Sequence, residues 1–182
     1  MNDKVQVGFA FLPLAVLAPL ILGIALLLPV FSGFPVFFRG RRLGWKKRPF
    51  MIAKFRSMIV ATERIREKSR DDPRITGFGR ILRRFSLDEL PQLWNVIHGD
   101  MLLVGPRPIA EEEDRLYGKY SAEIHSVKPG ITGLWQVSGR NLTTFRRRKA
   151  INVYYVRHKS WKLDLWILYK TILAVVDGRG AF

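Results

Sequence analysis

The longest apolar segment of the chain lies at its N-terminus, where no charged residue occurs between Val5 and Phe38. The residues from Phe9 to Phe31 are apolar on every face of a helix, and about 20 such residues are enough to cross a bilayer. A signal peptide is one alternative, but the apolar run is too long for it and no small-residue cleavage site follows. A buried hairpin of a soluble domain is another. The pattern favours a membrane-embedded helix.

Prolines interrupt this predicted helix at Pro13, Pro19 and Pro29. Pro19 lies near the middle of the run, and it lacks the N–H that an intact helix needs, so we expect a kink or break there. A kinked helix can still span the bilayer. It can also turn back and leave by the leaflet it entered, provided that the freed carbonyls find partners. The residues alone leave both paths open.

The charges around the run predict its orientation. Only Lys4 and the α-amine are positive on its N-terminal side, so the positive-inside rule places the basic C-terminal flank in the cytoplasm. The formal net charge of +16 attracts polyanions such as nucleic acid, anionic lipid or a phosphorylated substrate. Because a membrane run precedes the basic region, anionic lipid is the simpler partner and no nucleic acid is expected. The basic flank consists of Arg39, Arg41, Arg42, Lys46, Lys47 and Arg48.

Beyond this flank, hydrophobic periodicity predicts a mostly helical α/β domain with few short strands. A turn is expected at residues 71–74, where Pro73 moves the preceding residue out of the helical region. The helix expected at 160–176 suits either a core or an interfacial position. The expected elements are a strand beginning near 50–55, a helix at 57–69, a loop leading into a short basic helix within 77–85, helices at 91–98 and 109–121, a short strand or extended segment within 99–108, an ordered loop at 127–140, and helices at 145–161 and 160–176.

The candidate chemistry centres on two adjacent carboxylates, Asp88 and Glu89, in the segment SLDELPQLWN. Ser86 and Glu89 match a capping box, and Pro91 is alternatively the first residue of the helix. Near a helix N-terminus and arginines, a carboxylate should stay ionised at neutral pH. An ionised Asp can attack phosphorus, and a neighbouring Glu can hold Mg²⁺. The alternative is that both acids only stabilise the helix start.

Basic residues flank the acid pair in sequence. Arg83 precedes it and Arg107 follows it, with a proline on each side of Arg107. Arginine binds phosphate with two hydrogen bonds and neutralises charge that develops on it. Ion pairing or contact with lipid head groups is the alternative for these arginines, and Lys54 is equally typical of an exposed strand position.

The residues that several other kinds of functional site require are absent from the sequence. The chain has no cysteine, which excludes disulfides and thiolate metal sites. It contains neither a GxxxxGK[ST] phosphate loop nor a GxSxG serine elbow. His98, His125 and His158 are widely separated and form no HExxH motif, so they do not indicate a histidine-ligated metal.

Three spaced motifs resemble the bacterial sugar transferase family, the monotopic polyprenyl-phosphate phosphoglycosyl transferases. They are KFRSM at 54–58, the segment 71–108 that ends in GPRP, and VKPGITGLWQVSGR at 127–140. The resemblance runs from about Leu14 to the C-terminus. It implies a re-entrant membrane helix within residues 1–38, a catalytic domain over residues 39–182 with amphipathic interfacial helices, and a place at the cytoplasmic face of the bacterial inner membrane.

The resemblance also implies a reaction. Members transfer a sugar 1-phosphate from a UDP-sugar to undecaprenyl (polyprenyl) phosphate and release UMP with the help of Mg²⁺. For this chain the resemblance implies that the sugar is a hexose. Further membrane helices and oligomers are possible. The implied roles are Asp88 as nucleophile, Glu89 as Mg²⁺ ligand, Arg83 and Arg107 as phosphate ligands, Lys54 beside the site, and Gln136 and Arg140 as nucleotide-sugar ligands.

The chain departs from the family pattern in its membrane helix. Ala18 precedes Pro19 where the family has a serine, and the basic-then-Asp signature ahead of the helix is missing. A non-enzymatic basic membrane adaptor is the alternative from another class, and it would need none of Asp88, Glu89 and Arg107. A membrane-tethered nucleic-acid-binding protein is a further alternative, and it predicts a steeply salt-dependent affinity for DNA or RNA.

Overall fold

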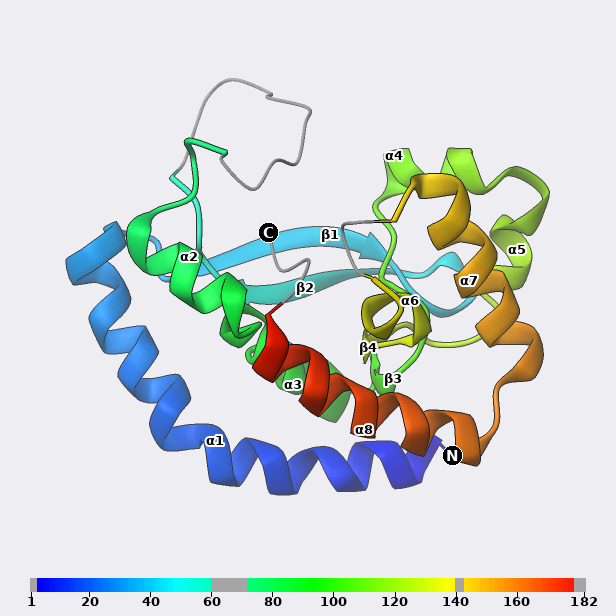
Figure 1. Ribbon diagram of the computed structural model, residues 1–182, viewed down its shortest axis with the longest axis horizontal. Helices are drawn as coiled ribbons and strands as arrows, with labels where there is room; N and C mark the ends of the chain where they lie inside the picture. Colours follow the sequence, from blue (N-terminus) through cyan, green and yellow to red (C-terminus); the bar gives the residue numbers. More distant parts are fainter. Residues whose placement is uncertain (1–2, 60–71, 140–142, 179–182) are drawn as a thin grey trace.

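The computed structural model describes residues 3–59, 72–139 and 143–178. Its first element is α1 (Asp3–Ser32), a continuous helix that contains Pro13, Pro19 and Pro29. The part of this helix from Val5 to Ser32 is long and apolar enough to cross a membrane. Figure 1 shows α1 bending about midway, so that it follows two edges of the body. The predicted kink is confirmed, and the path of the helix through a bilayer stays a prediction.

The remaining elements form a mostly helical body with two small sheets (Figure 1). The strands β1 and β2 pair antiparallel, and β3 and β4 pair parallel. The elements are β1 (Phe37–Leu43), η1 (Trp45–Lys47), β2 (Pro49–Phe55), α2 (Gly77–Arg84), η2 (Leu87–Glu89), α3 (Gln92–Ile97), β3 (Leu102–Val104), α4 (Glu111–Asp114), η3 (Arg115–Tyr120), α5 (Ser121–Ile124), β4 (Gly130–Thr132), α6 (Leu134–Val137), α7 (Phe145–His158) and α8 (Trp161–Asp177).

Most predicted elements are present, and the misses have local causes. The strands β2 and β3 and the helices α2, α3, α7 and α8 confirm the pattern. The single helix expected at 109–121 is wrong, because Gly118 adopts φ 56° and divides the segment into α4, η3 and α5. The start of the helix expected at 57–69 is also wrong, since Met58 forms a β-bridge with Ile75. The rest of that helix lies outside the described residues. The predicted domain boundary at residue 38 falls within β1, and the division into two domains stays a prediction.

The two halves of α1 pack on different parts of the body. Ala10 in the first half is fully buried in a cluster with Val96 of α3. Leu28 in the second half is fully buried in a cluster with Phe55 of β2. The other faces of α1 expose large apolar side chains, which is typical of a surface that contacts a membrane. These exposed residues include Phe9, Leu12, Val16, Leu22, Leu26 and Val30.

A buried polar network joins α1 to α8 and β3. Gln6 of α1 donates from Nε2 to Asp164 Oδ2 at 3.3 Å, and the Val104 N–H donates to Gln6 Oε1 at 3.0 Å. The Tyr155 hydroxyl donates to Asp164 Oδ1 at 2.7 Å. These side chains are almost inaccessible to water, so each polar atom depends on its protein partner. The network therefore fixes the position of α1 against α8.

Close approach between two glycines joins β3 to β4. A Cβ atom on Gly130 would lie 2.0 Å from the backbone nitrogen of Gly105, a distance that real Cβ atoms do not show. Only glycine fits at such a contact. The segment that follows Gly105 carries Arg107, so this contact determines where Arg107 leaves the sheet.

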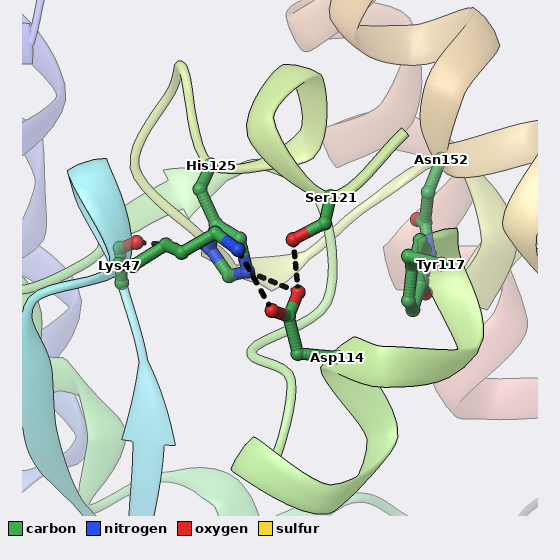
Figure 2. A network of polar contacts seen from close by, with 7 residues as sticks. Lys47, Asp114, Tyr117, Ser121, His125 and Asn152 are labelled. Carbon is green, nitrogen blue, oxygen red and sulfur yellow. Dashed lines mark hydrogen bonds and ion pairs between the residues drawn. The ribbon is translucent and has the colours of Figure 1, made fainter. Parts of the chain in front are cut away.

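A second polar network ties the turn between β1 and β2 to α4 and α5 (Figure 2). Asp114 Oδ1 accepts hydrogen bonds from Ser121 Oγ at 2.6 Å and from His125 Nε2 at 3.0 Å, and Oδ2 pairs with Lys47 Nζ at 3.0 Å. His125 Nδ1 lies 3.0 Å from the Gly44 carbonyl oxygen. Each ring nitrogen of His125 thus lies beside an oxygen acceptor, so the ring joins Asp114 to the turn between β1 and β2.

We expect Asp114→Asn to lower the free energy of unfolding by about 1–3 kcal/mol near neutral pH, because the amide keeps one acceptor oxygen but loses the negative charge and the second acceptor oxygen. Burial alone would raise the pKa of Asp114, but hydrogen bonds from Ser121, Lys47 and His125 hold the pKa below its ordinary value. This stabilisation is therefore present above the unfolded-state pKa of about 3.9 and is lost as the pH falls below it. Thermal unfolding in one detergent across this range measures the difference.

Glu111→Gln is the matched control on the same helix. Its ion pair with Arg41, at 3.8 Å, is exposed, so its removal should change the free energy of unfolding by less than about 0.5 kcal/mol. Equal effects of the two substitutions, or a difference that persists unchanged at pH 3, would show that the Asp114 network does not stabilise the fold.

Candidate active site

The acid pair Asp88–Glu89 lines a cavity of about 830 Å³. One wall of this cavity is apolar and comes from α1 and α8. The other side is polar and comes from β2, α2, η2 and the segments around β3 and β4. The apolar wall contains Phe9, Leu12, Leu17, Leu165, Leu168 and Val175, and the polar side contains Lys54, Asp72, Arg74, Arg83, Asp88, Glu89, Arg107, Trp135 and Gln136.

The turn between α2 and α3 places both acids at the cavity. Ser86 follows α2 in the left-handed conformation with φ 55°, and its side chain forms no cap hydrogen bond. The predicted capping box is therefore wrong. Asp88 and Glu89 lie in the short 3₁₀ turn η2, and Pro91, with φ −61°, directly precedes α3. The alternative prediction, a helix that begins at Pro91, agrees with the structure to within one residue.

The two carboxylates lie in different electrostatic surroundings. Glu89 forms an ion pair with Lys54 at the end of β2. Burial of Asp88, with repulsion from Glu89, raises the pKa of Asp88 to about 6 despite attraction by Lys54 and Arg83. The pKa therefore moves opposite to the direction that the neighbouring arginines alone predict. At pH 7 a carboxyl group with this pKa is still mostly ionised, as a nucleophile requires.

Two further arginines, Arg83 and Arg74, lie on the same side of the cavity and are held by hydrogen bonds. Arg83 donates from Nε to Ser57 Oγ at 2.8 Å, which holds its guanidinium beside the acid pair. Arg74 donates from Nη2 to Asp72 Oδ2 at 2.6 Å, and this hydrogen bond lowers the pKa of Asp72 to about 2. The sequence indicated only a turn at Asp72 and Arg74, so their place at the cavity was missed.

Arg107 and Gln136 reach the cavity around the indole of Trp135. The Arg107 guanidinium lies 5.1 Å from the centroid of the Trp135 ring. Gln136 donates from Nε2 to the Ile131 carbonyl oxygen at 3.0 Å. Lys54, Arg83, Asp88, Glu89, Arg107 and Gln136 thus meet at one cavity although they are far apart in sequence. Arg140 lies outside the described residues.

The donor set limits how a metal could bind. Among the described residues, no group of three or more His, Cys, Asp or Glu side chains is arranged to hold a metal ion. Mg²⁺ binds typically through one or two carboxylates plus waters and substrate phosphates rather than in an all-protein cage. Asp88 and Glu89, side by side at the cavity, fit this mode.

This arrangement is typical of an enzyme that handles a phosphorylated substrate next to an apolar one. A carboxylate pair lies among cations that suit phosphate oxygens, and the same cavity has an apolar wall formed partly by the N-terminal helix. Comparison with known proteins agrees with this class. The family model described as "Bacterial sugar transferase" matches residues 2–178, and the chain belongs to this family.

The curated relatives have matching names. The exopolysaccharide production protein ExoY of Sinorhizobium fredii is 40% identical, with 97% of this chain and 86% of the relative covered. A UDP-glucose:undecaprenyl-phosphate glucose-1-phosphate transferase of Xanthomonas campestris is 41% identical over all of this chain but only 39% of its own length. The undecaprenyl-phosphate galactose phosphotransferase of Salmonella typhimurium is 40% identical, with 83% of this chain and 35% of the relative covered.

Proposed function

We propose that this protein transfers a sugar 1-phosphate from a UDP-sugar to undecaprenyl phosphate and releases UMP. The observation that carries the proposal is the single cavity in which Asp88 and Glu89, a set of arginines and an apolar wall of α1 meet. Such a cavity suits one water-soluble and one lipid-linked phosphate. The names of the relatives from Xanthomonas campestris and Salmonella typhimurium support these substrates. The reaction would begin a glycan, as in exopolysaccharide synthesis.

The transfer takes place in two steps at Asp88. A carboxylate oxygen of Asp88 attacks the β-phosphorus, and the bond from this phosphorus to the bridging oxygen breaks, so that its electrons leave with UMP. A phosphate oxygen of undecaprenyl phosphate then attacks the same phosphorus and releases the Asp88 carboxylate. The half-buried position of Asp88 supports this role, because a nucleophile is stronger with less water around it.

The neighbouring side chains bind and orient the phosphates. Arg83 and Arg107 neutralise charge that develops on the transferred group, and Ser57 orients Arg83. Lys54 holds Glu89 in place, and Gln136 binds the nucleotide sugar. Arg140, which lies outside the described residues, remains a predicted nucleotide-sugar ligand.

Mg²⁺ would be held by Glu89, beside Asp88, together with substrate phosphate oxygens. When bound, it would neutralise phosphate charge and favour departure of the nucleotide. Removal of divalent cations by a chelator should then abolish turnover, and such dependence would also exclude a non-enzymatic adaptor.

Asp88→Asn should lower the rate of UMP release by about a thousand-fold or more, because an amide oxygen does not form the phosphosugar intermediate. The assay follows UMP release from a panel of UDP-sugars with undecaprenyl phosphate and Mg²⁺. Asp177→Asn, the same substitution at an exposed residue outside the cavity, should leave the rate within about two-fold, as ordinary surface changes do. UMP release by Asp88→Asn at a rate near that of the unsubstituted protein would contradict the mechanism.

The bent helix α1 enters and leaves the membrane by its cytoplasmic leaflet in this proposal. Its support is that both halves of α1 pack on the same body, through Ala10 in one cluster and Leu28 in another. A straight span would separate one half from the body. The basic residues after α1 place that body in the cytoplasm, where anionic lipid attracts it. Self-association stays a prediction.

Single cysteines at the two ends of α1 test this path. Because the chain has no cysteine, Asp3→Cys and Arg39→Cys each introduce one thiol. A membrane-impermeant maleimide should label both variants in inside-out membrane vesicles and neither in intact spheroplasts. Labelling of the two variants from opposite faces would mean that α1 spans the bilayer.

A further inference from the structure

Buried polar atoms without partners gather around Trp135. In the described part of the chain, Arg107 Nε, Arg148 Nε, Trp135 Nε1 and Gln136 Oε1 are all buried and make no hydrogen bond. The Arg107 and Arg148 guanidiniums lie 5.1 and 5.2 Å from the centroid of the Trp135 ring. Three of these atoms, the two arginine Nε atoms and the indole Nε1, are donors. Buried donors without acceptors are rare in folded proteins, so their grouping indicates that an acceptor is bound there at some stage.

The charges around this group are also unbalanced. Burial lowers the pKa of Arg148, and repulsion by Arg107 lowers it further. The same two causes lower the pKa of Arg42 on β1, and the next residue of that strand, Leu43, forms a β-bridge with Ile109, two residues beyond Arg107. Arg148 Nη1 forms a long ion pair with Glu113 Oε1 at 3.9 Å. Three half-buried guanidiniums thus share weak acidic compensation, an arrangement that favours an anion with several acceptor oxygens.

We propose that Arg42, Arg107 and Arg148 form a phosphate subsite for the uridine nucleotide, and that the subsite holds the α-phosphate as UMP leaves. The inference rests on the proposed function. Arg107 also lines the cavity that contains Asp88, so it connects the subsite to the reacting phosphorus. Arg148, on α7, is a further substrate-binding residue that acts beside Arg107 across the Trp135 ring.

The position of the subsite favours the nucleotide over the lipid phosphate. Figure 1 shows α4 and α7, which carry Glu113 and Arg148, on the side of the body away from the middle of α1. The apolar wall of the cavity, which suits the polyprenyl chain, is formed by α1 and α8 instead. Both substrates carry a phosphate, so the experiment must distinguish binding of the nucleotide from binding of the lipid phosphate.

The test compares UMP binding to the full chain and to variants in the same detergent with Mg²⁺. Arg148→Gln should weaken UMP binding about ten-fold or more, since one charged hydrogen-bonding group is lost. The UMP affinity of Arg148→Lys should lie between those of Arg148→Gln and the unsubstituted protein. Arg42→Gln provides a second, independent variant. Arg147→Gln, an exposed neighbour on α7, makes the same change of charge and should bind UMP as the unsubstituted protein does.

Two further readouts separate a binding role from a structural one. Without nucleotide, Arg148→Gln should unfold at nearly the same temperature as the unsubstituted protein, because the ion pair of Arg148 with Glu113 is long and its Nε makes no hydrogen bond. The KM for undecaprenyl phosphate should stay unchanged. Unchanged UMP affinity in both Arg148→Gln and Arg42→Gln overturns the inference, as does a rise in the lipid KM without loss of UMP affinity. If the unsubstituted protein binds UMP but transfers no sugar phosphate, the proposed function fails while the subsite stands.

Discussion

Gln6 is a polar residue in an otherwise apolar helix, and its amide is fully buried against Asp164 and the backbone of Val104. At the other end of α1, Arg56 donates hydrogen bonds to the carbonyl oxygens of Ser32 and Phe34. The bent helix is thus fixed to the body by polar contacts at both ends. A buried amide without partners would be costly, so these contacts specify one position for α1.

That position determines the shape of the candidate active site. The Gln6–Asp164 contact joins α1 to α8, and these two helices form the apolar wall of the cavity. Between the two fixed ends, the middle of α1 stays exposed and faces outward, as Val16 does. A lipid chain that follows this surface would therefore arrive at the cavity that contains Asp88. The same packing therefore sets the position of the helix bend relative to the acid pair.

Electrostatics supports phosphate binding at this site, because its arginines are only partly neutralised by ion pairs within the protein. The chain carries a formal net charge of +16, and several of its arginines are half-buried with few acidic partners. Buried cations of this kind keep unsatisfied donors until an anion supplies acceptors. Within this field Asp88 is held at a raised pKa by burial and by Glu89, yet remains mostly ionised at neutral pH. The cavity thus combines a carboxylate suited to act as the proposed nucleophile with cations suited to receive the leaving charge.

The sequence predicts the features that depend on local pattern. The apolar run, the kink expected at Pro19, the helix after Pro91 and the final helix all follow from periodicity or proline chemistry. The pairing of β1 with β2 depends on non-local contacts, and β1 reads as a basic membrane flank in the sequence. The left-handed conformation of Ser86 likewise has no local signal, which is why the capping box was wrong.

The candidate site likewise contains residues that the sequence identifies and residues that only the fold identifies. The acid pair and Arg107 stand out from their spacing and motif context, and the structure brings them together at one cavity. Arg148 does not stand out, because it lies in a run of three arginines that look equivalent in sequence. Burial against Trp135 separates it from its exposed neighbours, and burial is a property of the folded chain.

The proposed mechanism requires Asp88 to form a covalent bond to the transferred phosphosugar. The direct measurement is mass spectrometry of the peptide that contains Asp88, after the protein is mixed with a UDP-sugar and Mg²⁺ without any lipid acceptor. The account predicts release of UMP and a mass increase of one sugar phosphate on that peptide, both absent in Asp88→Asn. UMP release that occurs only when undecaprenyl phosphate is present, with no modified peptide, would contradict it.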